Sequence, residues 1–303
     1  MSSTKKNKGE SGKYIIESSM TDLWNVWMTE LHQGKSGLTV KVNGLVETTQ
    51  SKFQRIDILD TADFGKMLVL YGSMMVADND LTSYNEMITH VPLFVHPKPN
   101  KVLIIGGGDG GALTNVMKHP EVKTAYMCEI DKMVVEVCKR HFPKLGVGFK
   151  DKRAKLVFQD GKKLIENTKE KFDMIMLDLS DPIGPAADLF QKKFHQKVHD
   201  RLNPDGIMVA QSESPFFNPN TVKQMYKNLR SIFPIVEMYT AHVPIYPSAY
   251  WSFAFCSKKY HPIDDFDADR YKRLKLKNNY YNADIHFGAF CLPEYVKELI
   301  GDK

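Results

Sequence analysis

Acidic side chains follow a series of apolar runs in this 303-residue sequence, and their positions suggest chemistry on a cation. Asp109 follows KVLII within a glycine run, Glu129 follows AYMC, Asp160 follows KLVFQ, and Asp178 and Asp181 follow FDMIML. Apolar runs of this kind predict buried parallel strands, whose carboxyl ends meet at one edge of a sheet. We therefore expect one strongly negative site, which disfavours NAD, FAD and ATP and attracts a sulfonium or an ammonium group.

The glycines around Asp109 predict that a nucleoside binds beside them. Gly106, Gly108 and Gly111 fit the spacing G-x-G-x-x-G, which lets a ligand approach the main chain before a helix starts. Glu129 ends the next apolar run, where an acid commonly binds ribose hydroxyls. The Asp160-Gly161 pair is compatible with a plain turn or with a carboxylate that accepts from an adenine amino group, and we favour the adenine contact.

The segment DLSDPIGPA, residues 178–186, looks like a rigid loop that carries reacting groups. Two carboxylates stand three positions apart, and two prolines and a glycine restrict the chain that follows them. A helix cap followed by an ordinary turn is the alternative, because aspartate and proline are common in both.

The elements that hold these residues divide the chain into parts. Residues 1–13 read as a disordered tail, and residues 14–78 as a small N-terminal antiparallel β-domain with a hairpin turn at Asn43-Gly44. Residues 79–303 alternate helix and strand, which predicts a doubly wound, mostly parallel α/β sheet. A capping box at Ser83-Tyr84-Asn85-Glu86 is expected to open the first helix, and a last amphipathic helix to begin at Pro293.

Composition narrows the partners and the compartment. The net charge is +5, but the lysines are spread along the chain and no basic stripe carries interleaved aromatics, so we expect no nucleic-acid partner. No apolar run approaches the roughly 20 residues that span a membrane, and no signal-peptide core is visible, which predicts a cytoplasmic protein without a membrane partner. The four cysteines lack metal-ligand spacing and read as reduced core residues, and no metal site is expected.

Five motifs together resemble those of the spermidine synthase family of aminopropyltransferases: GGGDGG, CEID, QDG, DLSDPIGPA and VPIYPSAYW, in this order. The resemblance implies a methyltransferase-like (Rossmann-type) catalytic domain behind an N-terminal β-domain. It implies transfer of the aminopropyl group of decarboxylated S-adenosylmethionine to a diamine, foremost putrescine, with release of methylthioadenosine. Decarboxylated S-adenosylmethionine would be a co-substrate, no cofactor would be needed, and the protein would be a homodimer or homotetramer.

The resemblance also implies roles for individual residues. Asp178 would accept the proton, and Asp109 would hold the aminopropyl ammonium. The amine-acceptor side would be formed by Tyr84, Asn85, Asp109, Asp178, Asp181 and Tyr246, of which Tyr84, Asp109, Asp178 and Asp181 are the expected catalytic residues. The donor nucleoside would contact Gln54, Leu70, Gly106, Gly108, Asp109, Glu129, Ile130, Asp160, Gly161, Pro185, Ala186 and Leu189.

Several positions depart from the family pattern: Tyr71, Met75, Leu81, Asn85, Leu179 and Ala249, the last of which stands where glycine is common. Most of these positions belong to the acceptor side or to the cover of the site. Leu81 and Asn85 suggest a changed far end of the amine pocket. The acceptor therefore stays open among putrescine, cadaverine, agmatine and spermidine.

Two rival functions fit part of the sequence. A methyltransferase that uses S-adenosylmethionine shares the glycine-acid pattern, but it does not explain the second carboxylate motif or the β-domain. Asp109 would also face the carboxylate of ordinary S-adenosylmethionine, like charge against like. A non-catalytic protein that senses nucleosides or polyamines is the second rival, and the retained carboxylates disfavour it.

Overall fold

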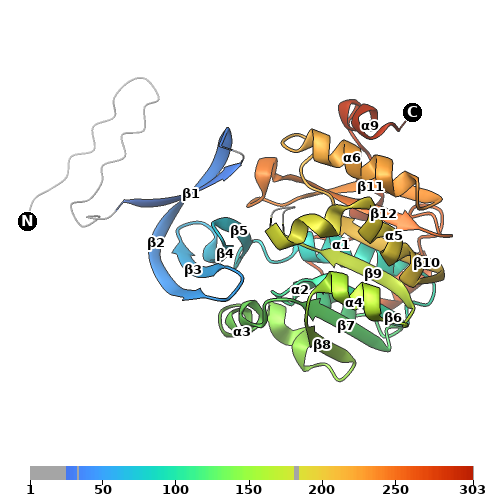
Figure 1. Cartoon of the computed structure of the whole chain (residues 1–303), viewed down its shortest axis with the longest axis horizontal. Coiled ribbons are helices and arrows are strands. Elements are labelled where there is room, and N and C mark those ends of the chain that lie inside the picture. Colours follow the sequence, from blue (N-terminus) through green and yellow to red (C-terminus); the bar gives the residue numbers. More distant parts are fainter. Residues whose placement is uncertain (1–24, 33, 181–183, 303) are drawn as a thin grey trace, which may run out of the picture.

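Two β-sheets organise the chain in the computed structural model, which describes residues 25–32, 34–180 and 184–302 (Figure 1). The side chains of residues 184–186 lie outside that description. The predicted segment 1–13 and the site residue Asp181 also lie outside the described residues. A five-stranded sheet comes first along the chain, and a seven-stranded sheet follows it.

The first sheet is antiparallel throughout, and its strands pair in chain order. It contains β1 (Val26–His32), β2 (Ser36–Gln50), β3 (Arg55–Thr61), β4 (Gly65–Leu70) and β5 (Ser73–Ala77). Strand β1, which contains Trp27, is an edge strand of this sheet.

The hairpin predicted at Asn43-Gly44 is wrong, because β2 runs through these residues as a single strand. The pairing register shifts between Val42 and Gly44, so the dipeptide forms an irregularity within the strand. The two halves of β2 have different partners: residues 36–42 pair with β1, and residues 42–50 pair with β3. A turn here would remove one of these two pairings.

The second sheet has the strand order β11-β12-β10-β9-β6-β7-β8. Its strands are β6 (Lys101–Gly106), β7 (Thr124–Glu129), β8 (Ala154–Phe158), β9 (Phe172–Asp178), β10 (Leu202–Gln211), β11 (Ile235–His242) and β12 (Tyr250–Ser257). The five strands from β10 to β8 are parallel, and β12 is antiparallel to both of its neighbours. The doubly wound, mostly parallel sheet predicted from the sequence is therefore present.

Helices cover both faces of the large sheet. Val102 and Ile104 of β6 belong to the core with α1 (Ser83–Val95) and α2 (Gly111–Met117). Leu103 and Ile105 belong to the opposite core. That second core includes side chains of α4 (Gly161–Asn167), α5 (Lys192–Arg201), α6 (Pro219–Arg230) and α9 (Glu294–Ile300). Burial on both faces explains why the central strand has four consecutive apolar residues.

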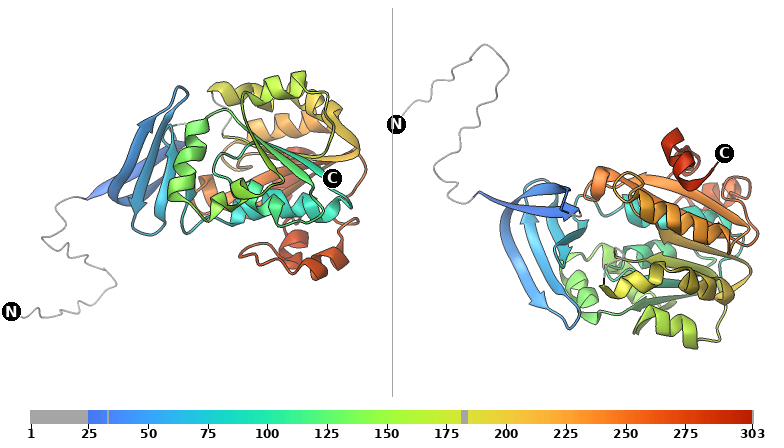
Figure 2. Two further views of the ribbon diagram at one scale, coloured as in Figure 1. Left: turned by 90° about the horizontal axis from the view of Figure 1, so that it is seen from below. Right: turned by 45° about the horizontal axis from the view of Figure 1, so that its top comes forward.

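Helix α3 (Lys132–His141) joins the two sheets and stands between them in Figure 2. Its Val134 and Val137 pack in one cluster with Ile58 and Leu68 of the first sheet. Polar contacts add to this packing: the Nε2 atom of His141 lies 2.7 Å from Oε2 of Glu47 in β2. The small sheet is thus packed directly against the helix that follows Glu129.

The remaining helical segments are α7 (Ala268–Leu274), α8 (Ala283–Gly288) and the 3-10 turns η1 (Leu145–Lys150), η2 (Gly184–Phe190) and η3 (Pro247–Ala249). The predicted helix at Pro293 corresponds to α9, which begins at Glu294 directly after that proline.

The capping box predicted for α1 is wrong, although the helix does begin at Ser83. The Ser83 hydroxyl donates to Oδ1 of Asp80 at 2.9 Å. The Glu86 carboxylate accepts from the backbone N–H groups of residues 279, 280 and 281, at 3.0, 2.8 and 2.8 Å. Glu86 therefore binds the C-terminal segment to α1 instead of capping its own helix.

The cysteines are free, as predicted, but one of them is not a core residue. Cys128, Cys138 and Cys256 are buried, whereas Cys291 is exposed. Cys291 lies between α8 and α9, where the chain runs over the surface.

A prediction concerns Tyr71, one of the departures from the family pattern. Tyr71 and Gly72 form the two-residue turn between β4 and β5 and both have positive φ, 52° and 91°. A left-handed backbone conformation destabilises a tyrosine by about 1 kcal/mol. The Tyr71 side chain is 80% exposed, so its packing offsets little of this strain. We expect Tyr71→Asn to raise the free energy of unfolding by about 1 kcal/mol in urea denaturation, since asparagine tolerates this conformation.

Tyr295→Asn is the matched control, because Tyr295 is also exposed, at 49%, but lies in the regular helix α9. This control should not gain stability. A Tyr71→Asn variant no more stable than the parent would contradict the interpretation.

Candidate functional site

The glycine turn and Asp178 are held in contact by the pairing of β6 with β9. Gly106 lies opposite Asp178 in this register, and Gly107 N–H donates to the Asp178 carbonyl at 3.0 Å. A Cβ atom on Gly106 would lie 2.0 Å from that carbonyl oxygen, and one on Gly107 would lie 2.9 Å from Asp178 Oδ2. Both residues also have positive φ, so the turn requires glycine for space and for conformation.

Asp178 is a buried carboxylate with one oxygen engaged. Its Oδ1 accepts from the Tyr84 hydroxyl at 2.7 Å, while Oδ2 is buried and has no hydrogen-bond partner in the described part of the chain. The pKa of Asp178 is raised to about 7, first by burial and then by the charge of Asp109, while the Tyr84 hydrogen bond acts in the opposite direction. A carboxylate with this pKa accepts a proton near neutral pH.

Asp109 lies in the same turn and is also buried. Its Oδ1 accepts from the Gly111 N–H at 2.5 Å, and burial raises its pKa. Asp109 and Asp178 thus both lie beside the glycine turn, where each carboxylate raises the cost of ionising the other.

The first turn of α1 contacts the segments of both carboxylates. Tyr84 reaches Asp178, and the next side chain, Asn85, lies against Gly111: a Cβ atom on Gly111 would be 2.3 Å from the Asn85 amide. The Asn85 Nδ2 group donates to the Leu81 carbonyl at 3.2 Å. Its Oδ1 is buried without a partner among the described residues, which leaves an acceptor atom beside the Asp109 loop.

Glu129, the predicted ribose contact, lies beside the same turn. A Cβ atom on Gly108 would be 2.9 Å from Glu129 Oε2, and the other oxygen accepts from Asp131 N–H at 2.8 Å. The pKa of Glu129 is raised to about 7, mainly by burial and also by the charges of Asp131 and Asp109. Gly108 thus leaves room for the carboxylate of the neighbouring strand.

The N-terminal sheet approaches the site through Gln54. Gln54 Nε2 and the Ser51 hydroxyl both donate to Asp131 Oδ2, at 3.2 and 2.6 Å, two residues after Glu129. Leu70 pairs with Ile56 in the same sheet and packs against the α3 cluster. Asp131 and Ser51 were not among the predicted site residues, although Asp131 is the last residue of the CEID motif.

The Asp160-Gly161 pair begins α4. Asp160 Oδ1 accepts from the N–H groups of Lys162 and Lys163 at 2.8 and 3.4 Å, so the carboxylate caps the helix. A Cβ atom on Gly161 would lie 2.4 Å from Ile105 Cγ2, which explains the glycine. The helix cap thus engages one carboxylate oxygen of Asp160. The contact of this side chain with adenine remains a prediction.

The remaining donor residues are partly described. Ile130 follows Glu129 and is half-buried, and Leu189 lies in η2 against the second core. Pro185 and Ala186 belong to η2, but their side chains lie outside the description.

Tyr246, the predicted acceptor residue of the β11–β12 loop, meets Tyr84. The two ring centroids are 5.6 Å apart in an edge-on arrangement, and the Tyr246 hydroxyl donates to the Met75 carbonyl at 3.0 Å. Tyr84, Asp178 and Tyr246 thus come from three distant parts of the sequence and form one side of the site.

Two buried polar residues near Asp178 were not among the predicted site residues. Gln211 is the last residue of β10, and Glu213 follows two positions later. Gln211 Nε2 donates to the Leu179 carbonyl at 3.3 Å and to Glu213 Oε1 at 3.2 Å. Both side chains are buried, and β10 is the neighbour of β9. The strand before them was predicted, so the rule that sites form at carboxyl ends of strands would have found them.

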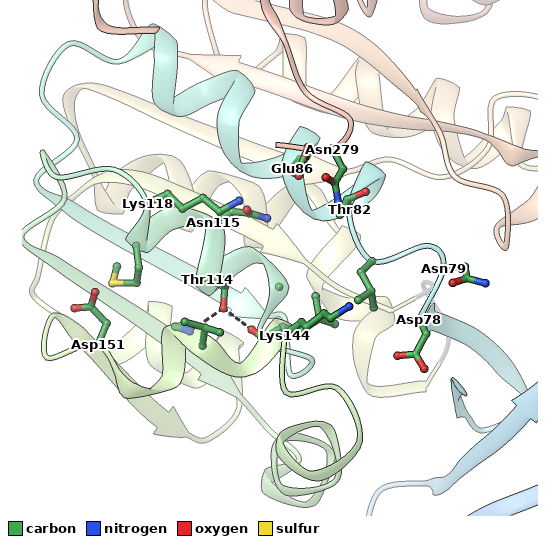
Figure 3. A pocket seen from close by; sticks show the side chains of 16 residues that line it. Asp78, Asn79, Thr82, Glu86, Thr114, Asn115, Lys118, Lys144, Asp151 and Asn279 are labelled. Carbon is green, nitrogen blue, oxygen red and sulfur yellow. Dashed lines mark hydrogen bonds between the residues drawn. The ribbon is translucent and has the colours of Figure 1, made fainter. Parts of the chain in front are cut away.

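A cavity of about 600 Å³ lies between α1, α2 and η1 (Figure 3). Gly111 of the glycine pattern and Leu81 line it, whereas the carboxylates Asp109, Asp178 and Glu129 do not. Its acids already have partners: Glu86 binds the C-terminal segment, Asp151 pairs with Arg153, and Asp78 accepts from the Lys66 N–H. Leu81 lines this cavity and packs in the cluster that joins α3 to the small sheet, and its effect on the amine pocket, like that of Asn85, stays a prediction.

The site contains acids but no metal-ligand set. Within the described ranges, no group of three histidine, cysteine, aspartate or glutamate side chains is arranged to hold a metal ion. A buried carboxylate with one unpartnered oxygen can bind a cation or accept a proton.

Two family descriptions match the chain. The spermine/spermidine synthase domain covers residues 81–267, and the spermidine synthase tetramerisation domain covers residues 26–80. Among curated relatives, the polyamine aminopropyltransferase of Clostridioides difficile is 43% identical over 281 residues, covering 92% of this chain and 99% of the relative. That of Caldicellulosiruptor saccharolyticus is 42% identical over 275 residues, covering 91% and 98%.

Solved structures agree with these relatives. A spermidine synthase in complex with the transition state analogue AdoDATO is similar with a TM-score of 0.88 and 39% identity, covering 91% of this chain and 95% of the other. The spermidine synthase from Thermotoga maritima has a TM-score of 0.87 and 37% identity, covering 94% and 99%. The predicted fold class and enzyme class are confirmed, and the chain belongs to the spermidine synthase family of polyamine aminopropyltransferases.

Proposed function

We propose that the protein transfers the aminopropyl group of decarboxylated S-adenosylmethionine to a diamine, with putrescine as the foremost acceptor and Asp178 as the proton acceptor. The observation that carries this proposal is the buried Asp178 carboxylate, with Oδ1 bound by Tyr84 and Oδ2 unpartnered among the described residues. A similar spermidine synthase binds the transition state analogue AdoDATO, which supports a donor of this class.

The proposed reaction is an in-line displacement. An amine nitrogen attacks the aminopropyl carbon next to the sulfonium, the new C–N bond forms as the C–S bond breaks, and the electron pair of that bond stays on sulfur in methylthioadenosine. The attacking amine loses a proton to Asp178. Since the sulfonium is already a good leaving group, the protein mainly aligns amine, carbon and sulfur.

The donor is proposed to lie along the glycine turn. Glu129 beside Gly108 suits ribose hydroxyls, and Asp109 suits the ammonium of the aminopropyl group. The unpartnered Asn85 Oδ1 beside the Asp109 loop offers a further acceptor for an ammonium N–H. The remaining residues proposed to contact the donor are Gln54, Leu70, Gly106, Ile130, Asp160, Gly161, Pro185, Ala186 and Leu189.

The acceptor amine is proposed to lie between Asp178 and the Tyr84–Tyr246 pair, with Asp181 contributing from outside the described residues. Buried Glu213 adds a further carboxyl group near this side, and Gln211 connects it to the Leu179 carbonyl. A chain of carboxylates along the site suits a diamine, which carries a charge at each end.

We further propose that the small sheet and the α/β part, residues 14–78 and 79–303, act as separate domains in a homodimer or homotetramer. The edge strand β1 exposes Val26, Trp27 and Leu31, at 48, 53 and 69%, and the tetramerisation description covers this sheet.

Over the described residues, no helix has the length and apolarity to cross a membrane. A cytoplasmic location and the absence of a nucleic-acid partner stay predictions.

Product analysis tests the function directly. The protein is incubated with decarboxylated S-adenosylmethionine and putrescine, cadaverine, agmatine or spermidine, and product masses are measured. We expect the amine to gain one aminopropyl group, with an equal amount of methylthioadenosine. Ordinary S-adenosylmethionine is the control and should give no transfer; a methylated product with it would favour the rival methyltransferase.

The same panel tests the role of Asn85. If this short, neutral side chain changes the far end of the amine pocket, an acceptor other than putrescine should be used at a comparable or higher rate. A strong preference for putrescine would contradict that hypothesis without affecting the proposed transfer.

Asp178→Asn tests the proton acceptor. The amide keeps the size and polarity of the side chain but cannot take the proton, so we expect kcat to fall by at least about 100-fold while donor affinity, measured by calorimetry, is retained. Asp173→Asn is the control, because Asp173 is a buried carboxylate at the opposite end of β9 that accepts from the Lys101 N–H at 2.8 Å. Unchanged turnover in Asp178→Asn would remove Asp178 from this role.

The pH profile gives an independent test. Below the pKa of Asp178 the carboxyl group is protonated and cannot act as a base, so kcat/KM should fall as the pH drops through about 7. The Tyr84 hydroxyl stabilises the ionised form, so Tyr84→Phe should move this midpoint upward. Tyr239→Phe, which removes a buried hydroxyl bound to the Met87 carbonyl, should leave the midpoint in place.

A further inference from the structure

Strained backbone gathers in one place beside the acceptor side of the proposed site. Five described residues other than glycine have positive φ: Tyr71, Glu213, Ser248, Ala249 and Lys275. Three of the five, Glu213, Ser248 and Ala249, belong to the two segments that meet where β10 ends and β12 begins. Strain of this kind persists only where the surroundings hold the backbone, and it is common at functional sites.

One side-chain hydrogen bond joins the two strained segments. Ser214 Oγ lies 2.9 Å from Ser248 Oγ, and it also accepts from the Phe217 N–H at 3.3 Å. Ser214 is fully buried, whereas Ser248 is exposed in η3. On the Ser214 side, the backbone is fixed further by Ser252, whose hydroxyl donates to the Glu213 carbonyl at 2.7 Å.

The strained pair Ser248-Ala249 determines the position of Tyr246. The Ala249 N–H donates to the Tyr246 carbonyl at 2.8 Å, and the Val243 N–H donates to the Ala249 carbonyl at 2.9 Å, which closes the loop of residues 243–249. Rotation of Ser248 or Ala249 out of the left-handed region would break these bonds. Tyr246 would then lose its place beside Tyr84.

Two further contacts fix the loop of residues 243–249 from the other side. The Tyr246 hydroxyl donates to the Met75 carbonyl of the small sheet at 3.0 Å. The Ile245 N–H donates to Asp80 Oδ2 at 3.4 Å, in the segment between β5 and α1. The Ser214–Ser248 bond connects this loop to the segment after β10, where Glu213 lies.

We propose that Ser214 and Ser248 are positioning residues for the acceptor side: their hydrogen bond holds the left-handed Ser248-Ala249 pair and thereby holds Tyr246 against Tyr84. This inference rests on the proposed function for its effect on catalysis. We expect the Ser214–Ser248 bond to affect only the part of the site that binds the amine. The glycine turn and Glu129, which would bind the donor, follow other strands of the sheet.

Kinetics and hydrogen exchange together test the two serines in the full-length protein. We expect Ser214→Ala and Ser248→Ala each to raise KM for the amine by about 3- to 10-fold, the effect of one hydrogen bond, with a smaller change in kcat and none in the affinity for methylthioadenosine. The double variant should raise KM no further than either single variant, since both remove the same bond. Amide exchange in residues 243–249 should become faster in all three.

Ser257→Ala is the matched control. Ser257 is fully buried at the opposite end of β12, and its hydroxyl accepts from the N–H groups of Lys259 and Tyr260 at 3.1 and 2.8 Å. This variant should lower stability without changing KM for the amine or exchange in residues 243–249.

Unchanged amine KM and unchanged exchange in Ser214→Ala and Ser248→Ala overturn the inference, as does an equal KM effect in Ser257→Ala. A parent protein that transfers no aminopropyl group overturns the proposed function instead. In that case the exchange rates of residues 243–249 still decide whether the two serines hold the loop.

Discussion

Uncompensated negative charge in a buried site is the constraint on which the rest of the structure depends. Burial raises the pKa values of Asp109, Asp178 and Glu129, and no lysine, arginine or histidine in the described part of the chain counteracts this effect. Ionised carboxylates that are buried without a positive partner lower the stability of the fold, unless a bound ligand supplies the positive charge. The proposed substrates, a sulfonium with an ammonium tail and a diamine, have the charges that this arrangement lacks.

The backbone explains how the acids can stand so close together. Asp178 contacts the glycine turn through its carbonyl and its carboxylate, and Glu129 occupies the space beside Gly108. Side chains at these glycines would occupy the space of the carboxylates. The glycine motif therefore serves the protein's own acids as well as the nucleoside that the motif predicts.

Much of this could be predicted from the sequence, because the strands have strong local signals. The apolar run before Gly106 and the acid after each later run predicted both the parallel sheet and the shared edge. Predictions from local sequence were wrong where a contact with a distant segment determines the structure. Asn43-Gly44 stays within β2 because both halves of that strand are paired with neighbouring strands. The Glu86 carboxylate binds the C-terminal segment instead of capping its own helix. Gln211 and Glu213 were missed because no short motif marks them.

The contact of Glu86 with residues 279–281 gives the order in which the site can be completed during synthesis. Glu86 lies in the first turn of α1, two residues after Tyr84, and its partners come almost two hundred residues later. A nascent chain that has already formed the glycine turn and the central strands still lacks this attachment for the helix that carries Tyr84. Residues 279–281 must therefore be synthesised and leave the ribosome before this attachment of α1 can form.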